Sequence, residues 1–134
     1  MNVLFLSSIS MAATQLNIDS LSVDGAEIRS LSCQIDKGSL LASMSIGAAI
    51  AAQKEALDLC APKGAAFSVS WTWRGDNSTS EVLKSSDESA RNCIGASIAT
   101  VQAPLQGTCS AFLLTGDIEQ AEIALQKLLT KAQK

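Results

Sequence analysis

The alternation of apolar and polar residues along the chain predicts four β-strands. It is strictest over residues 66–73, where the side chains of Phe67, Val69, Trp71 and Trp73 share one face. The same period of two predicts further strands at residues 27–36, 79–84 and 108–115. The turn sequence R-G-D-N joins the strands 66–73 and 79–84 in a hairpin.

Less regular patterns surround these strands. Residues 15–24 alternate loosely and then reach Gly25, which predicts either an added edge strand or an extended lead-in. Within residues 27–36, strict alternation sorts the side chains into two faces. One face holds Arg29, Leu31, Cys33 and Ile35, and the other holds Ile28, Ser30, Ser32 and Gln34.

Three segments have the apolar spacing of helices. The first spans residues 40–60 and is stopped by a proline and a glycine that follow it. The second starts at a capping box formed by Ser85 and Glu88 and ends near Val101. The third begins at Ile118 and carries acidic residues in its first turns and lysines near its end, as the helix dipole favours.

The order of these elements predicts an α+β fold, a two-layer sandwich of the form β-α-β-β-α-β with an additional C-terminal helix. The sheet is expected to be antiparallel or mixed, with the helices on one face. In this split βαβ arrangement the strands 27–36 and 108–115 are neighbours. Residues 15–134 are expected to form a single domain. Residues 1–14, an apolar run ending in small residues, are predicted to be either a signal peptide or a disordered leader.

Four widely spaced cysteines, Cys33, Cys60, Cys93 and Cys109, predict two disulfides. Their spacing argues against a zinc knuckle and against a C-x-x-C redox pair. Cys33 and Cys109 fall mid-strand on the predicted neighbours, and Cys60 and Cys93 lie on two helices expected on the same sheet face. The pairing Cys33–Cys109 with Cys60–Cys93 is therefore the natural one. It indicates an oxidising compartment, periplasmic or secreted, whereas four buried free thiols in a cytosolic core are the alternative.

Composition excludes several function classes. The chain has no histidine, the commonest general base and transition-metal ligand. Its net charge of −3 includes no basic stripe, so nucleic acids and anionic membranes are disfavoured as partners. No uncharged apolar run is long enough for a transmembrane segment. A nucleophile pair of Lys84 and Ser85 is less favoured than a helix cap at Ser85. We therefore expect no enzyme activity, no cofactor and no metal site.

The middle of the chain resembles a known family. The first predicted helix ends in Cys60, the run A-P-K-G-A-A-F-S-V-S-W-T-W-R-G-D follows, then E-V-L-K-S-S, then A-R-N-C-I-G-A-S-I. Residues 39–101 thus resemble the TonB-type C-terminal domain, most closely the cysteine-containing AgmX/PglI-like C-terminal domain of delta-proteobacterial gliding-motility proteins. Cys60 and Cys93 match the two cysteine positions of that family, whereas Cys33 and Cys109 have no counterpart. The resemblance implies a periplasmic protein-binding module of the cell envelope without enzyme activity.

We expect Trp71 and Trp73 to pack in the core, which leaves a polar sheet face on the other side. The residues predicted to bind a partner protein are Thr108, Ser110, Phe112 and Leu114, on this face or at the free edge of their strand. The competing expectation is a solvated face partly covered by the third helix. Two other hypotheses are a small-ligand carrier, with a hollow along the alanine-rich first helix, and a secreted inhibitor or effector with a rigid loop at Arg74–Asn77.

Overall fold

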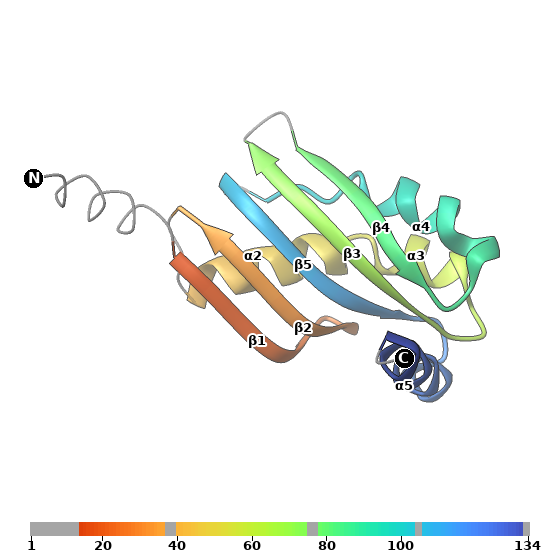
Figure 1. Ribbon diagram of the computed structural model, residues 1–134. Helices are drawn as coiled ribbons and strands as arrows, with labels where there is room; N and C mark the ends of the chain where they lie inside the picture. The colour runs from red at the N-terminus through yellow and green to blue at the C-terminus, as the bar shows by residue number, and fades with distance from the viewer. Residues whose placement is uncertain (1–13, 37–39, 75–77, 104–105, 133–134) are drawn as a thin grey trace, which may run out of the picture.

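The computed structural model describes residues 14–36, 40–74, 78–103 and 106–132. Within these ranges five strands form one antiparallel sheet in the order β1-β2-β5-β3-β4 (Figure 1). The strands are β1 (Thr14–Val23), β2 (Ala26–Ile35), β3 (Ala65–Arg74), β4 (Thr79–Ser85) and β5 (Gln106–Thr115). The helices are α2 (Leu40–Ala51), α3 (Lys54–Cys60), the 3-10 helix η1 (Glu88–Ala90), α4 (Arg91–Ile98) and α5 (Ile118–Ala132). The α+β class is confirmed, and the predicted leader lies outside the described residues apart from Thr14.

The loosely alternating segment 15–24 belongs to a full edge strand, β1. It joins β2 through a two-residue turn in which both Asp24 (φ +47°) and Gly25 (φ +87°) have positive φ. Positive φ at both central residues is the geometry of a type I′ turn, whose twist matches that of the flanking strands. Leu16 and Ile18 of β1 pack against the main core, so the edge-strand interpretation is the correct one.

A bulge at Ser30 changes the faces of β2. Ser30 has a φ of +53°, and the register between β2 and β5 shifts between Arg29 and Ser32. Ile28 is therefore buried in the core together with Leu31, whereas Arg29 lies on the opposite face. The predicted faces are wrong at Ile28 and Arg29, because a bulge inserts one residue and inverts the alternation on one side of it.

The main core lies between the sheet and the helices α2, α3 and α4. Phe67, Val69, Trp71 and Trp73 of β3 are all buried there, as their alternation predicted. The two indole rings stack with their centroids 5.5 Å apart. Trp71 Nε1–H donates to the carbonyl of Ile98 at 3.2 Å, which ties the end of α4 to the sheet.

The helix predicted at residues 40–60 is divided into two helices. α2 ends in a tightened turn, in which the N–H of Gln53 donates to the carbonyl of Ile50 at 2.9 Å, and α3 follows. Ile50 and Leu57 are both buried in the same core. Because both helices bury their apolar side chains against one sheet, the apolar pattern continues through the break and does not reveal it.

The second helix starts differently from the predicted capping box. Ser85 Oγ accepts a hydrogen bond from the N–H of Asp87 and donates to the carbonyl of the same residue, at 3.0 and 2.6 Å. Asp87 is the cap, because its Oδ1 accepts from the N–H of Ser89 at 3.1 Å. The hydrogen bond from Arg91 lowers the pKa of the Glu88 carboxyl. Glu88 therefore pairs with Arg91, and the reciprocal bonds of a capping box are absent at Ser85.

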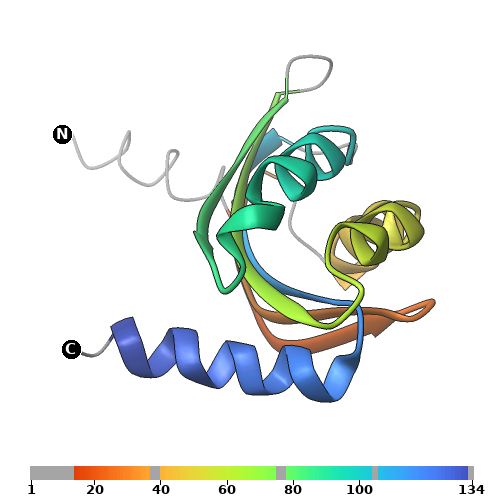
Figure 2. The same cartoon turned by 90° about the vertical axis from the view of Figure 1, so that its right-hand side faces the viewer.

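α5 packs on the opposite face of the sheet from the other helices (Figure 2). A second, smaller cluster is buried between α5 and the sheet and consists of Ala66, Leu114, Ala121 and Leu125. Arg29 Nη2 donates to Glu122 Oε1 of α5 at 2.6 Å. Burial alone would lower the pKa of Arg29, but its bonds to Glu27 and Glu122 raise it. The prediction that all helices cover one face is wrong for α5, because β5 is apolar on both sides near its end and each side needs a cover.

β5 lies at the centre of the sheet. It pairs with β2 on one side, which confirms the predicted neighbours, and with β3 on the other. The free edge predicted for the strand 108–115 is therefore wrong, since β3 occupies it. The outer strands of the sheet are β1 and β4.

Both predicted disulfides are present. Cys33 and Cys109 face each other on β2 and β5 with their Cα atoms 4.1 Å apart, and they are 1% and 3% exposed. Cys60 of α3 is bonded to Cys93 of α4, which lies on the surface. Two disulfides indicate that the chain folds in an oxidising, extracytoplasmic compartment. Among the described residues, no helix has the length and apolar character needed to cross a membrane.

Mild reduction is expected to open Cys60–Cys93 before Cys33–Cys109, because a thiolate must reach a sulfur atom to attack it. Titration with dithiothreitol, alkylation of free thiols and peptide mass mapping should label the first pair while the second stays intact. Unfolding in urea should remove the difference between the two bonds. Equal labelling of all four cysteines in the folded chain would contradict this order.

Candidate functional site

The described residues hold no thiol or metal cluster of the kind that catalysis uses. No group of three His, Cys, Asp or Glu side chains among them could hold a metal ion, and every cysteine is in a disulfide. Ser85, weighed above as a nucleophile beside Lys84, uses its hydroxyl to bond the backbone of Asp87. That hydroxyl has a structural role in the turn. The surfaces of the sheet are where partner binding was predicted.

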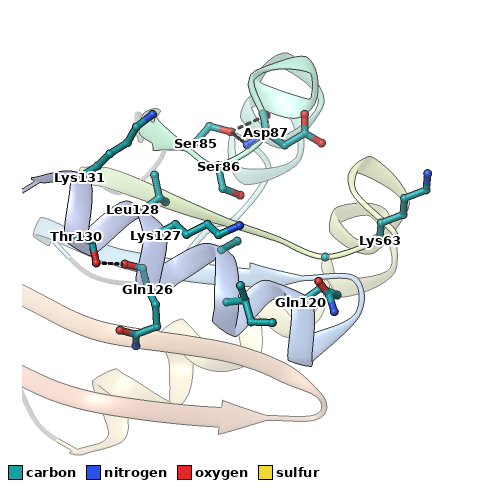
Figure 3. Close-up of a pocket in the computed structure, with 13 residues that line it drawn as sticks. Lys63, Ser85, Ser86, Asp87, Gln120, Gln126, Lys127, Leu128, Thr130 and Lys131 are labelled. Atoms are coloured by element: carbon teal, nitrogen blue, oxygen red, sulfur yellow. Dashed lines mark hydrogen bonds between the residues drawn. The ribbon is translucent and has the colours of Figure 1, made fainter.

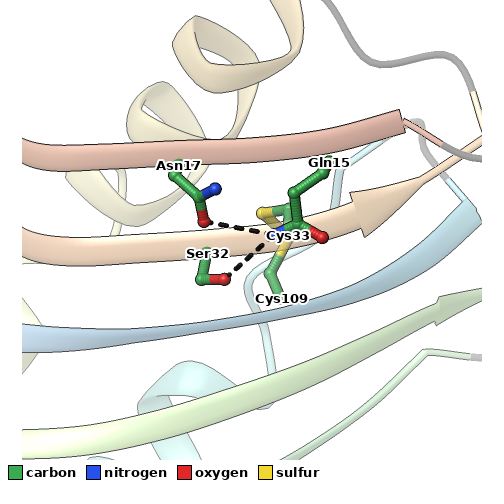
Figure 4. Close-up of a disulfide and its surroundings, with 5 residues drawn as sticks. All are labelled: Gln15, Asn17, Ser32, Cys33 and Cys109. Atoms are coloured by element: carbon green, nitrogen blue, oxygen red, sulfur yellow. Dashed lines mark hydrogen bonds between the residues drawn. A yellow bond between two sulfur atoms is a disulfide. The ribbon is translucent and has the colours of Figure 1, made fainter.

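One part of the second sheet face, at the beginning of β5, is polar and open. Two rows of side chains cross it from β1 to β4: Gln15, Gln34, Thr108, Thr72 and Thr79, then Asn17, Ser32, Ser110, Ser70 and Glu81. Gln15 Nε2 donates to Asn17 Oδ1 at 3.1 Å and to Ser32 Oγ at 3.3 Å, beside the strand that carries Cys33 (Figure 4). Seven of these ten residues, all except Asn17, Thr79 and Glu81, line a shallow hollow of about 390 Å³. The rows contain no apolar side chain that could anchor a partner.

The four partner-binding residues predicted on β5 fall into two pairs. Thr108 is exposed and Ser110 half-buried on the open polar face. Phe112 and Leu114 lie further along the strand and pack against the cluster under α5, where Leu114 is only 5% exposed. α5 therefore covers these two apolar side chains, which agrees with the competing expectation that the third helix partly covers this face.

Of the two outer strands, β4 is protected against pairing with another strand. It has seven residues, carries Glu81 and Lys84, and is joined to β3 through an irregular register. The carbonyl of Val82 already accepts a hydrogen bond from Arg91 Nη1 at 2.7 Å. Short length, charged side chains and bulges are the usual devices that stop edge strands from recruiting further strands.

β1 has fewer of these protections. It is ten residues long and keeps one register with β2 from Thr14↔Ile35 to Val23↔Ala26. It contains no proline and no lysine, and Asp19 is its single charged residue. β1 is the outermost strand at one side of the sheet (Figure 1), and no other strand of the described residues pairs with its outer edge.

The geometry of the Cys33–Cys109 pair indicates which backbone groups of β1 point away from β2. Its Cα separation of 4.1 Å is typical of a non-hydrogen-bonded pair, so Cys33 directs its N–H and C=O toward β1. The residue opposite Cys33 on β1 is Leu16. Alternation along the strand then directs the N–H and C=O of Gln15 and Asn17 toward the free edge.

α2 adds apolar surface near this edge. None of its twelve residues is charged, Met44 is 48% exposed, and Ala48 is exposed. The helix lies directly on β1 because position 47 is glycine: a Cβ there would fall 2.6 Å from Val23 Cγ2. A helix that is apolar on all sides is normally buried, so the uncovered side of α2 is an unusual surface for a solvent-facing helix.

The small residues of α2 do not create a ligand cavity. The hollow lined by Ile50, Leu57 and Leu113, between the helices and the sheet, measures about 10 Å³. That volume holds one water molecule at most. The small-ligand carrier therefore finds no support in this region. The loop predicted for an inhibitor, Arg74–Asn77, lies outside the described part of the chain apart from Arg74, which ends β3.

Comparison with known proteins identifies no relative. No protein-family model matches the chain, and no curated protein and no solved structure is significantly similar to it. The resemblance to TonB-type domains remains a prediction from residues 39–101. Function has to be argued from the surfaces described above.

Gly47→Ala is expected to lower the free energy of unfolding by about 1–3 kcal/mol, because the added methyl group must displace Val23 or α2. Hydrogen exchange should show faster exchange of the β1 amides. Gly95→Ala in α4 is the matched control, since nothing lies within 4 Å of its added Cβ. Alanine at that position should stabilise the helix by up to about 1 kcal/mol. Equal stability of the two variants would contradict close packing of α2 on β1.

Proposed function

We propose that this chain is a non-catalytic, exported binding module that takes an extended segment of another protein as a sixth strand beside β1. The unpaired, unprotected edge of β1 is the observation that carries the proposal. In strand addition, backbone hydrogen bonds supply affinity and alternate side chains supply specificity. The outward groups of Gln15 and Asn17 would begin the new ladder.

The surroundings of β1 indicate what kind of segment would fit. Alternate side chains of an added strand point to opposite faces of the sheet. On one face they would lie beside α2, whose exposed Met44 and Ala48 favour apolar side chains. On the other face they would continue the polar rows that begin at Gln15 and Asn17. A segment that alternates apolar and polar residues therefore matches this edge.

We propose that the chain acts outside the cytoplasm, in the cell envelope or as a secreted protein. The two disulfides support export, either to the periplasm or to the outside. The proposal includes the resemblance to TonB-type and AgmX-like C-terminal domains. It is supported by the helix–hairpin–helix order of residues 39–101 and by Cys60 and Cys93 at the two matched positions. The partner would then be another protein of the cell envelope.

Asn17→Pro should abolish strand addition while leaving the fold intact, because it removes an outward N–H and no bond to β2. Peptides selected against the wild-type chain from a random display library supply the ligand, and fluorescence polarisation measures their binding. We expect at least tenfold weaker binding to the Asn17→Pro variant and to Gln15→Pro, which has the same orientation. Ser110→Ala, on the open face away from the edge, should bind within about twofold of wild type.

Leu16→Pro provides the control for orientation. It removes an N–H that bonds to β2, so it should lower the melting temperature where Asn17→Pro does not. Amide shift perturbation by the selected peptides should concentrate on β1. Selected peptides that bind the two edge variants as tightly as wild type, or whose shifts lie on another surface, would refute the proposal.

A further inference from the structure

A groove runs along α5 on the side that faces the end of β4. Its volume is about 890 Å³, and α5 forms one wall. The turn Ser85–Asp87 and the loop at Lys63 and Gly64 form the other side (Figure 3). The groove continues into a second hollow of about 320 Å³ that shares Ser85, Leu128 and Lys131 with it. This groove lies outside the β1 edge and shares no residue with it.

Apolar side chains of α5 line the groove. Ile123 is 48% exposed, and Ala124 and Leu128 are half-buried at the border of the cluster under α5. Leu83 of β4 is 46% exposed and lines the second hollow. These side chains leave apolar surface uncovered along the length of the groove.

The polar groups of the opposite wall are already satisfied within the chain. Ser86 Oγ accepts from the N–H of Ala66 at 3.0 Å, and Ser85 Oγ is bonded to the backbone of Asp87. The Asp87 carboxylate accepts from the N–H and the hydroxyl of Ser89. The hydroxyls and the carboxylate of this wall are thus engaged within the chain, which leaves the lysines and the side-chain amides of Gln120 and Gln126 as polar groups for a ligand.

Four lysines border the two hollows: Lys63, Lys84, Lys127 and Lys131. None of them forms an ion pair with another residue that the structure describes. Three other cations of the described residues, Arg29, Lys54 and Arg91, are each paired with a carboxylate. With Arg91 included, five cations line the two hollows, together with the two carboxylates of Asp87 and Glu88. The formal charge of this lining is therefore +3, on a chain whose net charge is −3. Positive charge is thus concentrated where apolar surface is exposed.

The helix dipole accounts for only part of this cluster. It favours Lys127 and Lys131, which lie in the second half of α5. It gives no reason for Lys63, which follows α3, or for Lys84, near the end of β4. Figure 3 shows Lys131 and Lys63 at opposite ends of the groove, with Lys127 between them. Lysines from three different elements therefore surround one apolar strip.

We propose that this groove is a second binding site, for an acidic amphipathic segment of a partner protein. Apolar side chains of the segment would cover Ile123 and Leu128, and its carboxylates would pair with the lysines around them. The volume is within the range of ligand sites in proteins. A flat anionic bilayer matches the charge but not the shape, because the apolar strip lies in a groove between α5 and the Ser85–Asp87 turn.

The labelled peptide EELLEELLEE tests the proposal by fluorescence polarisation. It should bind the wild-type chain, weaken as sodium chloride is raised, and lose binding when its glutamates become glutamines. Lys127→Gln/Lys131→Gln should weaken binding about three- to tenfold, since each exposed pair contributes modestly. The double variant Ala99→Glu/Gln102→Glu makes the same change in net charge at exposed positions outside the groove and should bind as wild type does.

Ile123→Ser tests the apolar contribution and should also weaken binding, with no change in the melting temperature because the side chain is already half-exposed. The Asn17→Pro variant should bind the acidic peptide normally, so failure at the β1 edge and failure at the groove are distinguishable. Equal binding by the two double variants would overturn the proposal. Binding to phosphatidylglycerol vesicles but not to the peptide would overturn it in favour of a membrane surface.

Discussion

The pairing of β2 with β5 is the contact on which the rest of the structure depends. The hairpin of β1 and β2 joins the sheet through this ladder, and two of the residues that pair in it, Cys33 and Cys109, are 76 positions apart. Closing so long a loop is costly in chain entropy, and the disulfide removes much of that cost from folding. The buried Cys33–Cys109 bond therefore holds the β1 edge in place, and an oxidising compartment becomes a condition for having that edge at all.

The central strand β5 explains how the two proposed sites come to lie on different parts of the molecule. Its second face is apolar at Phe112 and Leu114 and polar at Thr108 and Ser110. α5 covers the apolar end, and by doing so it creates the groove between itself and the end of β4. The polar end stays open beside β1. One strand with two kinds of surface thus separates the β1 edge, whose single charged residue is Asp19, from a positively charged groove.

Much of this fold was predictable from periodicity, and the failures have identifiable physical causes. The spacing of apolar residues predicts most of the helices and strands and the burial of Trp71 and Trp73. The order of these elements then predicts the disulfide pairing. The bulge at Ser30 and the break after α2 depend on how distant segments pack, so alternation and capping rules missed them. For α5, the alternative expectation that the third helix partly covers the polar face is the one that the structure shows. The edge at β1 was indicated weakly by residues 15–24, whereas the groove joins residues from three elements that no local pattern connects.

The hydrogen bond from Arg91 to the carbonyl of Val82 has a consequence for assembly. A sheet that can accept strands at both sides can polymerise head to tail, because each added molecule offers a new receptive side. Under the proposed strand addition, β1 is the receptive side among the described strands, since β4 is charged, short and occupied at Val82. Recruitment would then end after one added strand, whether that strand is a foreign segment or a second copy joined β1 to β1. Such a sheet would form a finite complex and would not seed fibres.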